Sequence, residues 1–193
     1  MLSRLKRLQR ALTRDDVRSI SRRYFISNGF DGALTSVGVT VGSYLSGVPD
    51  GLTVFKIGIG AAIGLGISGV WSVWEIERAE KRAELMRIEH AMLIDLDETR
   101  IQRQKAGARR INALMSGIGP VIGVVLPMIP FLFEEPFLGM RDATLVSISV
   151  AVAILFMFGV YLADISEQNW IVAGARMGLA GIVVAVLNLI LPG

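Results

Sequence analysis

The sequence contains no cysteine and only one histidine among its 193 residues. The absence of cysteine excludes disulfide bonds and thiolate metal sites, and a single histidine excludes a multi-histidine site within one chain. A metal site must therefore use carboxylates, methionines, backbone oxygens or water, which suit hard or borderline divalent ions. The sequence also lacks a Ser–His–Asp set, a Walker loop and a dinucleotide fingerprint. We therefore expect no enzymatic activity and no permanently bound cofactor.

Long apolar runs, in contrast, fill most of the chain. Hydrophobic residues make up 52% of it and the mean hydropathy is +0.55, which is too apolar for an ordinary soluble domain. A bilayer core of about 30 Å needs roughly 20 apolar helical residues. Prolines in the third qualifying stretch (Pro120, Pro127 and Pro130) predict a kinked or interrupted helix there. The sequence thus predicts an all-α integral membrane protein with five transmembrane helices, over 24–46, 52–74, 111–133, 143–163 and 170–191.

The basic residues predict the orientation of these spans. Of the 20 Lys and Arg residues, 17 lie before residue 24 or between residues 75 and 110, which flank the first pair of spans. The positive-inside rule places both segments in the cytoplasm. We therefore expect a cytoplasmic N-terminus and an outside C-terminus, and the basic charge gives no reason to expect a nucleic-acid partner.

Two segments outside the spans have helical patterns of their own. Leucines at helical spacing, separated by Arg and Lys, predict an amphipathic helix on the inner leaflet within residues 1–23; a solvated basic tail is the alternative. The polar segment 75–110 predicts a cytoplasmic helical insert with a turn near residues 95–97. The predicted divisions are 1–23, 24–74 for the first two spans, 75–110, and 111–193 for the last three spans.

Asp31 is an acid inside the glycine-rich first span. At 1.5 Å per residue it lies roughly 10 Å into the bilayer, and Arg176 lies roughly 9 Å deep from the same side. An intramembrane acid usually marks an ion or proton path. The alternative is a structural ion pair between Asp31 and Arg176.

Three glutamates predict a second site on the insert. Glu77, Glu80 and Glu84 are spaced three and four residues apart, so they share a helical face. Several carboxylates that converge with a thioether or an imidazole can bind divalent cations. The alternative is a solvated helix with Glu–Lys and Glu–Arg pairs. The further candidate ligands on the following turns are Met86, Glu89 and His90.

Several stretches of the sequence resemble the vacuolar iron transporter family of five-span divalent-metal transporters. The most specific is "DGALTSVGVTVG", Asp31–Gly42, in which the Asp-Gly pair, two small hydroxyl residues and the final glycine are in register with the family. "PMIPF" at 127–131, "FGVYLA" and "GLAGIVVAVLNLI" resemble its later spans. The resemblance covers about residues 22–193 and identifies a divergent member, which we expect in the cell membrane of a prokaryote.

The resemblance implies a homodimer in the lipid bilayer whose two first spans line a path. It implies export of Fe²⁺ or Mn²⁺ from the cytosol by proton antiport, with Asp31 as a metal ligand or proton carrier and the cytoplasmic carboxylates collecting the ion. The expected residues along the path are Asp31, Gly32, Thr35, Ser36 and Ser68.

The chain departs from the family pattern at three places. Phe30 stands where asparagine is common, Gly69 stands where the family has a methionine ligand, and only Glu75 could correspond to its intramembrane glutamate. These departures leave the metal open. The alternative function is a non-transporting membrane scaffold or metal sensor, held together by the Asp31–Arg176 pair.

Overall fold

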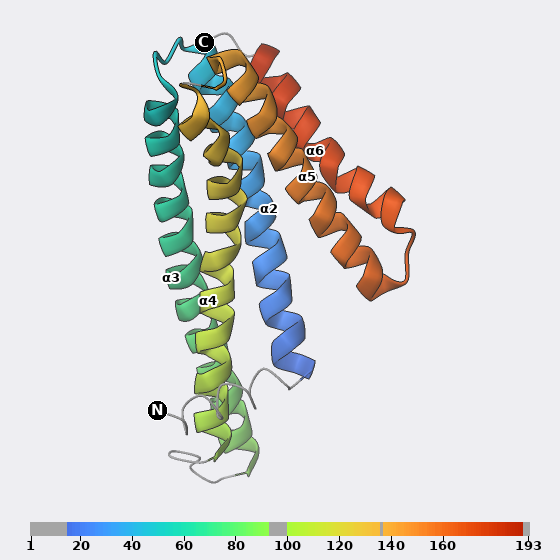
Figure 1. The fold of residues 1–193 in the computed structure, drawn as a ribbon. Coiled ribbons are helices and arrows are strands. Elements are labelled where there is room, and N and C mark those ends of the chain that lie inside the picture. The colour runs from blue at the N-terminus through green and yellow to red at the C-terminus, as the bar shows by residue number, and fades with distance from the viewer. Residues whose placement is uncertain (1–14, 93–99, 136, 191–193) are drawn as a thin grey trace.

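A computed structural model describes residues 15–92, 100–135 and 137–190. The regular structure within these ranges is entirely helical (Figure 1), which confirms the predicted all-α class. The elements in chain order are α2 (Asp15–Leu45), α3 (Gly51–Met92), α4 (Arg100–Met128), the 3-10 helix η1 (Ile129–Phe133), α5 (Met140–Ser166) and α6 (Trp170–Ile190).

Four helical stretches of the described chain are long and apolar enough to cross a membrane. They are Gly51–Ile88, Gly107–Phe133, Met140–Ser166 and Trp170–Ile190. The predicted first span at 24–46 falls within α2, which does not qualify by composition, because Asn28, Asp31 and several hydroxyl residues lower its hydropathy. The prediction of five apolar spans is therefore confirmed for four. At 31 residues, α2 is nevertheless about 46 Å long and runs alongside α4 (Figure 1).

Helices α2, α4 and α3 pack side by side in that order, and α5 and α6 form a hairpin that contacts α2 (Figure 1). Small residues allow the close approach of α2 and α4. A Cβ atom added to Gly32 would lie 2.5 Å from the carbonyl oxygen of Pro120, and one added to Gly123 would lie 2.5 Å from that of Gly29. Such contacts are typical of membrane helices, which associate by tight packing rather than by the hydrophobic effect.

The hairpin of α5 and α6 packs on α2 from the start of α5 as far as Phe158, whose ring lies 5.9 Å from that of Phe25. Near the start of α5, the Thr40 and Ser147 hydroxyls are buried and lie 2.9 Å apart. Toward the turn between α5 and α6, the hairpin leans away from α2 (Figure 1). The lean opens the space in which the cavity described below lies.

The N-terminus of α3 is capped by two carboxylates from different loops. Asp50 Oδ1 accepts a hydrogen bond of 2.8 Å from the Thr53 backbone N–H, and Asp50 Oδ2 accepts one of 2.9 Å from the Thr53 hydroxyl. These two hydrogen bonds hold the pKa of Asp50 below its ordinary value of 3.8. Glu134 Oε2 accepts a hydrogen bond of 3.1 Å from the Gly51 N–H. The two caps fix the α2–α3 loop next to the end of η1.

The prolines of the third span change the helix type at its end. Helix α4 continues through Pro120 and Pro127, and the chain becomes a 3-10 helix at Ile129, with Pro130 in its first turn. Both internal prolines are buried. The predicted interruption is thus a change from α-helix to 3-10 helix after Met128.

Two predicted features lie partly outside the described residues. The predicted N-terminal helix falls mainly on residues 1–14, and the described helix α2 already begins at Asp15. The turn predicted near 95–97 lies between α3 and α4, outside the described ranges.

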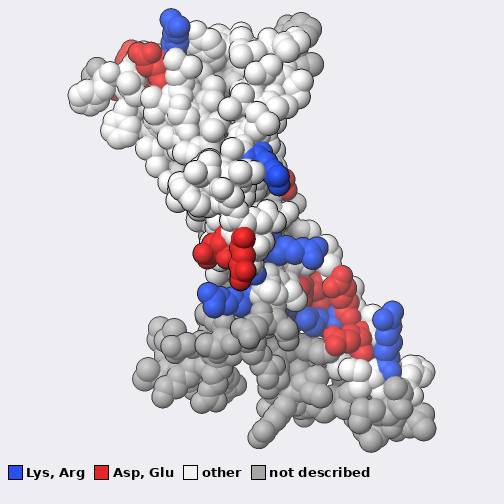
Figure 2. Space-filling view, turned by 90° about the vertical axis from the view of Figure 1, so that its right-hand side faces the viewer, with Lys and Arg blue, Asp and Glu red and all other residues white. Residues whose placement is uncertain are grey.

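On the side that carries α5 and α6, charged side chains gather in the lower part, and the upper part is mostly uncharged (Figure 2).

Candidate functional site

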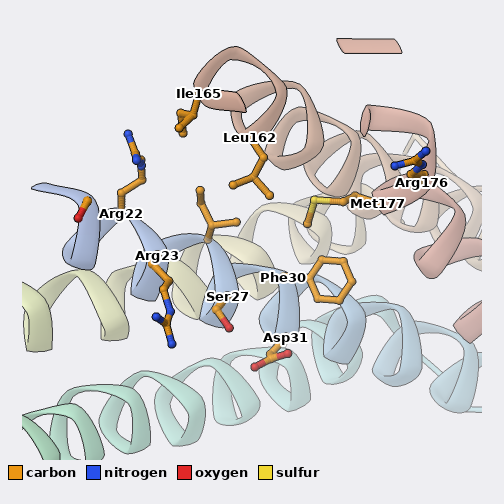
Figure 3. Close-up of a pocket in the computed structure, with 11 residues that line it drawn as sticks. Arg22, Arg23, Ser27, Phe30, Asp31, Leu162, Ile165, Arg176 and Met177 are labelled. Atoms are coloured by element: carbon orange, nitrogen blue, oxygen red, sulfur yellow. The ribbon is translucent and has the colours of Figure 1, made fainter. Parts of the chain in front are cut away.

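One side of α2 carries a polar stripe, formed by Arg23, Ser27, Asp31 and Thr35 at four-residue intervals. The first three are exposed, and Figure 3 shows their side chains pointing to the same side of the helix. The Thr35 hydroxyl donates a hydrogen bond of 2.8 Å to the backbone oxygen of Asp31. Within the described part of the chain, no hydrogen bond or ion pair reaches the Asp31 carboxylate.

The predicted path residues lie on two sides of α2 and on α3. Asp31 and Thr35 belong to the polar stripe. Gly32 and Ser36 are buried on another side of α2, where the Ser36 hydroxyl donates to the carbonyl of Ala33 at 2.7 Å. Ser68 is exposed on α3. Of the predicted path residues in the described chain, therefore, Asp31 and Thr35 lie on this stripe, and the Asp31 carboxylate is the exposed acidic group among them.

A cavity of about 680 Å³ separates α2 from the turn-side ends of α5 and α6. Asp31 and Arg176 both line this cavity, together with Arg22 and Arg23. Arg176 lies on α6, across the cavity from α2 (Figure 3). The Asp31 side chain points away from Arg176, to the other side of α2. The ion pair between Asp31 and Arg176 considered from the sequence is not formed in the described chain.

The glutamates of α3 differ in their surroundings. Glu77 is buried against α4, where Asn112 Nδ2 donates to its Oε1 at 2.9 Å and Lys81 Nζ lies 3.5 Å from its Oε2. Glu80 and Glu84 are exposed, although Glu84 takes part in another interaction. Glu77 therefore joins α3 to α4 within one chain.

The other candidate ligands lie further along the same helix. Met86 and His90 are exposed, and the side chain of Glu89 lies outside the described residues. Among the residues described, no group of three or more His, Asp or Glu side chains is close enough to hold a metal ion. Metal binding by this helix stays a prediction.

Sequence reasoning missed the polar contacts between the helices. Asn28 Nδ2 donates to the Ser116 backbone oxygen at 3.2 Å and also to the Ser116 hydroxyl, which in turn donates to the Gly69 carbonyl at 2.9 Å. This chain of bonds links α2, α4 and α3. Below it, the Arg109 guanidinium stacks over the Trp74 ring at 4.2 Å. Isolated polar residues in apolar spans, such as Asn28 and Asn112, are the sequence signal that could have found these contacts.

Comparisons with known proteins place the chain in one family. Residues 70–191 match the model of the VIT family, which is more than half of the sequence. An uncharacterized protein of Methanocaldococcus jannaschii is 30% identical over 168 residues, covering 86% of this chain and 85% of that protein. Because the alignment with the archaeal protein covers 86% of this chain, it includes the Asp31–Gly42 block whichever residue it starts from. No solved structure matches the sequence. The chain therefore belongs to the VIT family, the vacuolar iron transporters, as a divergent member with a prokaryotic relative.

Proposed function

We propose that this protein transports divalent metal ions, Fe²⁺ or Mn²⁺, out of the cytosol in exchange for protons, with Asp31 as the central ligand. Membership of the VIT family and the four apolar helices support membrane metal-ion transport. The metal, the coupled proton and the place of Asp31 belong to the proposal. So do the homodimer, the fifth span formed by α2, and the cell membrane as the location.

The observation that carries the proposal is the exposed carboxylate of Asp31 on a helix packed among apolar spans. A charged group near the bilayer centre costs about 2.5–3.5 kcal/mol on insertion scales. That cost falls if the polar stripe of α2 adjoins protein or water rather than lipid. A second copy of the chain, with its α2 stripe facing the first, provides such surroundings and brings two carboxylates to one path.

The chemistry of this arrangement suits exchange of a metal ion for protons. Two facing carboxylates, with backbone and hydroxyl oxygens nearby, form an oxygen-rich ligand set for a divalent cation. The same oxygens bind protons when the metal leaves. Because metal and proton compete for one site, a proton gradient can drive the metal in the opposite direction.

Metal flux in proteoliposomes tests the role of Asp31. The lumen is acidified, Mn²⁺ or Fe²⁺ is added outside, and metal uptake and proton release are recorded together. Asp31→Asn keeps the side-chain volume and removes the charge, so flux is expected to vanish while the protein still elutes as a folded species. Asp164→Asn, which removes an exposed carboxylate at the end of α5, is the matched control and should transport normally. Normal flux from Asp31→Asn would exclude an essential charge at this position.

The absence of native cysteine allows a direct test of the dimer. Gly38 lies on α2, where an added Cβ has no neighbour closer than 4.0 Å. Gly38→Cys should therefore form an intermolecular disulfide in oxidised membranes if two α2 helices face each other. Ser149→Cys, on an exposed side of α5, should not. Equal cross-linking of both variants would contradict an interface built on α2.

The proposed orientation has a cytoplasmic N-terminus and an outside C-terminus, with the charged ends of α3 and α4 in the cytoplasm. It rests on the positions of 17 of the 20 Lys and Arg residues. Reporter fusions after residue 193 and within 93–99 should give opposite accessibility. The same face for both would refute an odd number of crossings between them.

The exposed glutamates of α3 form a second part of the proposal, as a cytoplasmic collection site for the metal. Glu80 and Glu84 are exposed on α3, whereas Glu77 is engaged with α4. Calorimetric titration with Mn²⁺ should show a binding step that weakens in the double variant Glu80→Gln with Glu84→Gln. An unchanged isotherm would leave these residues a solvated helix face.

A further inference from the structure

The cavity between α2 and the α5–α6 hairpin has a chemistry of its own. One wall is a length of α2, and the other is formed by the end of α5 and the first turns of α6 (Figure 3). These segments are far apart in the sequence, and the space between them opens because the hairpin leans away from α2 at this end (Figure 1). The cavity volume of about 680 Å³ is large enough for part of an organic ligand.

The charges around the cavity favour an anion. Three arginines, Arg22, Arg23 and Arg176, are among the lining residues, against the single acidic residue Asp31. The Arg22 side chain lies on the side of Ile165, whereas that of Arg23 points with Asp31 to the other side of α2 (Figure 3). Arginine is always charged, and its planar group suits phosphate oxygens better than an ammonium group does. The stripe residues Arg23, Ser27 and Asp31 point to the other side of α2 (Figure 3), so the part of the cavity next to the hairpin has Arg22 and Arg176 and no carboxylate among its lining residues.

The remaining wall of the cavity is apolar. Phe30 of α2 lies opposite Leu162 of α5 and next to Met177 of α6 (Figure 3), and Ile26 and Ile165 also line the cavity. A small inorganic anion would satisfy the arginines and leave these side chains unfilled. An occupant that satisfies both parts must carry a negative head and an apolar chain.

The position of the cavity selects among such amphiphiles. Arg22 and Arg23 directly precede the apolar part of α2, and α6 begins at Trp170 on the same side of the molecule. In the orientation proposed above, this level is the headgroup region of the cytoplasmic leaflet, where anionic lipids attract basic residues. Basic pockets between membrane helices on this face bind lipid headgroups.

We propose that the cavity binds an anionic phospholipid of the cytoplasmic leaflet. Its phosphate contacts Arg22, and its acyl chain runs along Phe30, Leu162 and Met177. Arg176 then opposes the lipid from α6 and adds a second positive contact. The bound lipid fills the space between α2 and the leaning hairpin and holds the two at their present separation.

The test compares lipids on the purified, delipidated full-length protein by native mass spectrometry and thermal unfolding. Phosphatidylglycerol should remain bound and raise the melting temperature, whereas phosphatidylcholine with identical acyl chains and inorganic phosphate should do neither. These comparisons use the unmodified protein, so they hold whether or not a variant folds. Equal binding of the two lipids, or an equal effect of inorganic phosphate, would overturn the proposal.

A pair of double variants locates the site. Arg22→Gln with Arg176→Gln should weaken phosphatidylglycerol binding at least tenfold. Arg82→Gln with Arg110→Gln removes the same charge from exposed positions outside the cavity and should leave binding unchanged. Equal weakening in both would show general attraction to a basic surface, and no weakening in the first would show that the lipid binds outside this cavity; either result would overturn the proposal. Because no metal enters these measurements, their outcome is independent of the flux assay on Asp31.

Discussion

The two sides of α2 use the same residue type in different ways. On the side that faces α4, Gly32 lies so close to Pro120 that an added Cβ would collide with the backbone of the other helix. Cβ atoms added to Gly119 and Gly123 of α4 would likewise collide with the backbone of α2. On another side, Gly42 has no atom within 4 Å of such a Cβ. Glycine is thus required for packing on the first side, and nothing within the chain requires it on the second.

The polar groups of α2 follow the same division. Asn28 is bonded to α4, and Thr40 to α5. The Asp31 carboxylate and the exposed Ser27 side chain, on the polar stripe, meet no such partner among the described residues. In a bilayer, where unsatisfied polar groups are costly, this difference indicates that the stripe adjoins something other than lipid.

The largest expected effect comes from a methyl group on the packed side. Gly32→Ala places a Cβ about 2.5 Å from the backbone of Pro120, which cannot rotate away. Overpacking of this kind costs about 1–3 kcal/mol, so the melting temperature in detergent should fall clearly. Gly42→Ala is the matched control and should leave the monomer unaffected or slightly more stable, because alanine favours the helix. Equal destabilisation by both variants would mean that the second side is also closely packed, by another copy.

Much of the fold follows from sequence pattern. The apolar runs gave the positions of α3, the end of α4, α5 and α6 within a few residues, because hydrophobicity over some 20 residues is a strong signal. Helix α2 was also expected, but its polar residues make its mean hydropathy too low for it to qualify as a span by composition. Hydropathy averages a helix over its whole circumference, so it cannot distinguish polar residues that bond to neighbouring helices from those that line a path.

A smaller effect is expected from the polar link among α2, α4 and α3. Ser116→Ala removes the hydroxyl that donates to Gly69 and accepts from Asn28. Interhelical hydrogen bonds in membranes contribute on average about 0.6 kcal/mol and at most about 1.7 kcal/mol. Since Asn28 retains the backbone oxygen of residue 116, a loss of about 1 kcal/mol is expected.

The control for this bond is another serine that bonds to the same carbonyl. Ser72 is exposed on α3, and its hydroxyl reaches the Gly69 oxygen at 3.5 Å within its own helix. Ser72→Ala should therefore leave the unfolding midpoint unchanged. A larger loss for Ser72→Ala than for Ser116→Ala would show that contacts between the helices are not what stabilises this level of the bundle.

The candidate site was predictable only in part, for a geometric reason. Asp31 was identified because an acid in a span is rare, whatever the rotation of the helix. Which neighbours share its face depends on that rotation, and Gly32 and Ser36 lie on the packed side instead. Likewise, the spacing of Glu77 predicted a shared face with Glu80 but could not reveal Asn112, a partner 35 residues away.

The smallest expected effect is at the end of α2 where the α5–α6 hairpin closes on it. Ser147→Ala removes the partner of the buried Thr40 hydroxyl. In a helix, the threonine hydroxyl can instead bond to a carbonyl of the preceding turn, so the loss should not exceed about 0.6 kcal/mol. Ser149→Ala, whose exposed hydroxyl bonds only to its own helix at Leu145, should cause none. Chemical denaturation in mixed micelles can compare the two variants.

A loss well above about 0.6 kcal/mol for Ser147→Ala would mean that this single contact keeps the hairpin on α2. The cavity at the other end of the hairpin would then depend on the contact as well, and lipid binding should fall in the same variant.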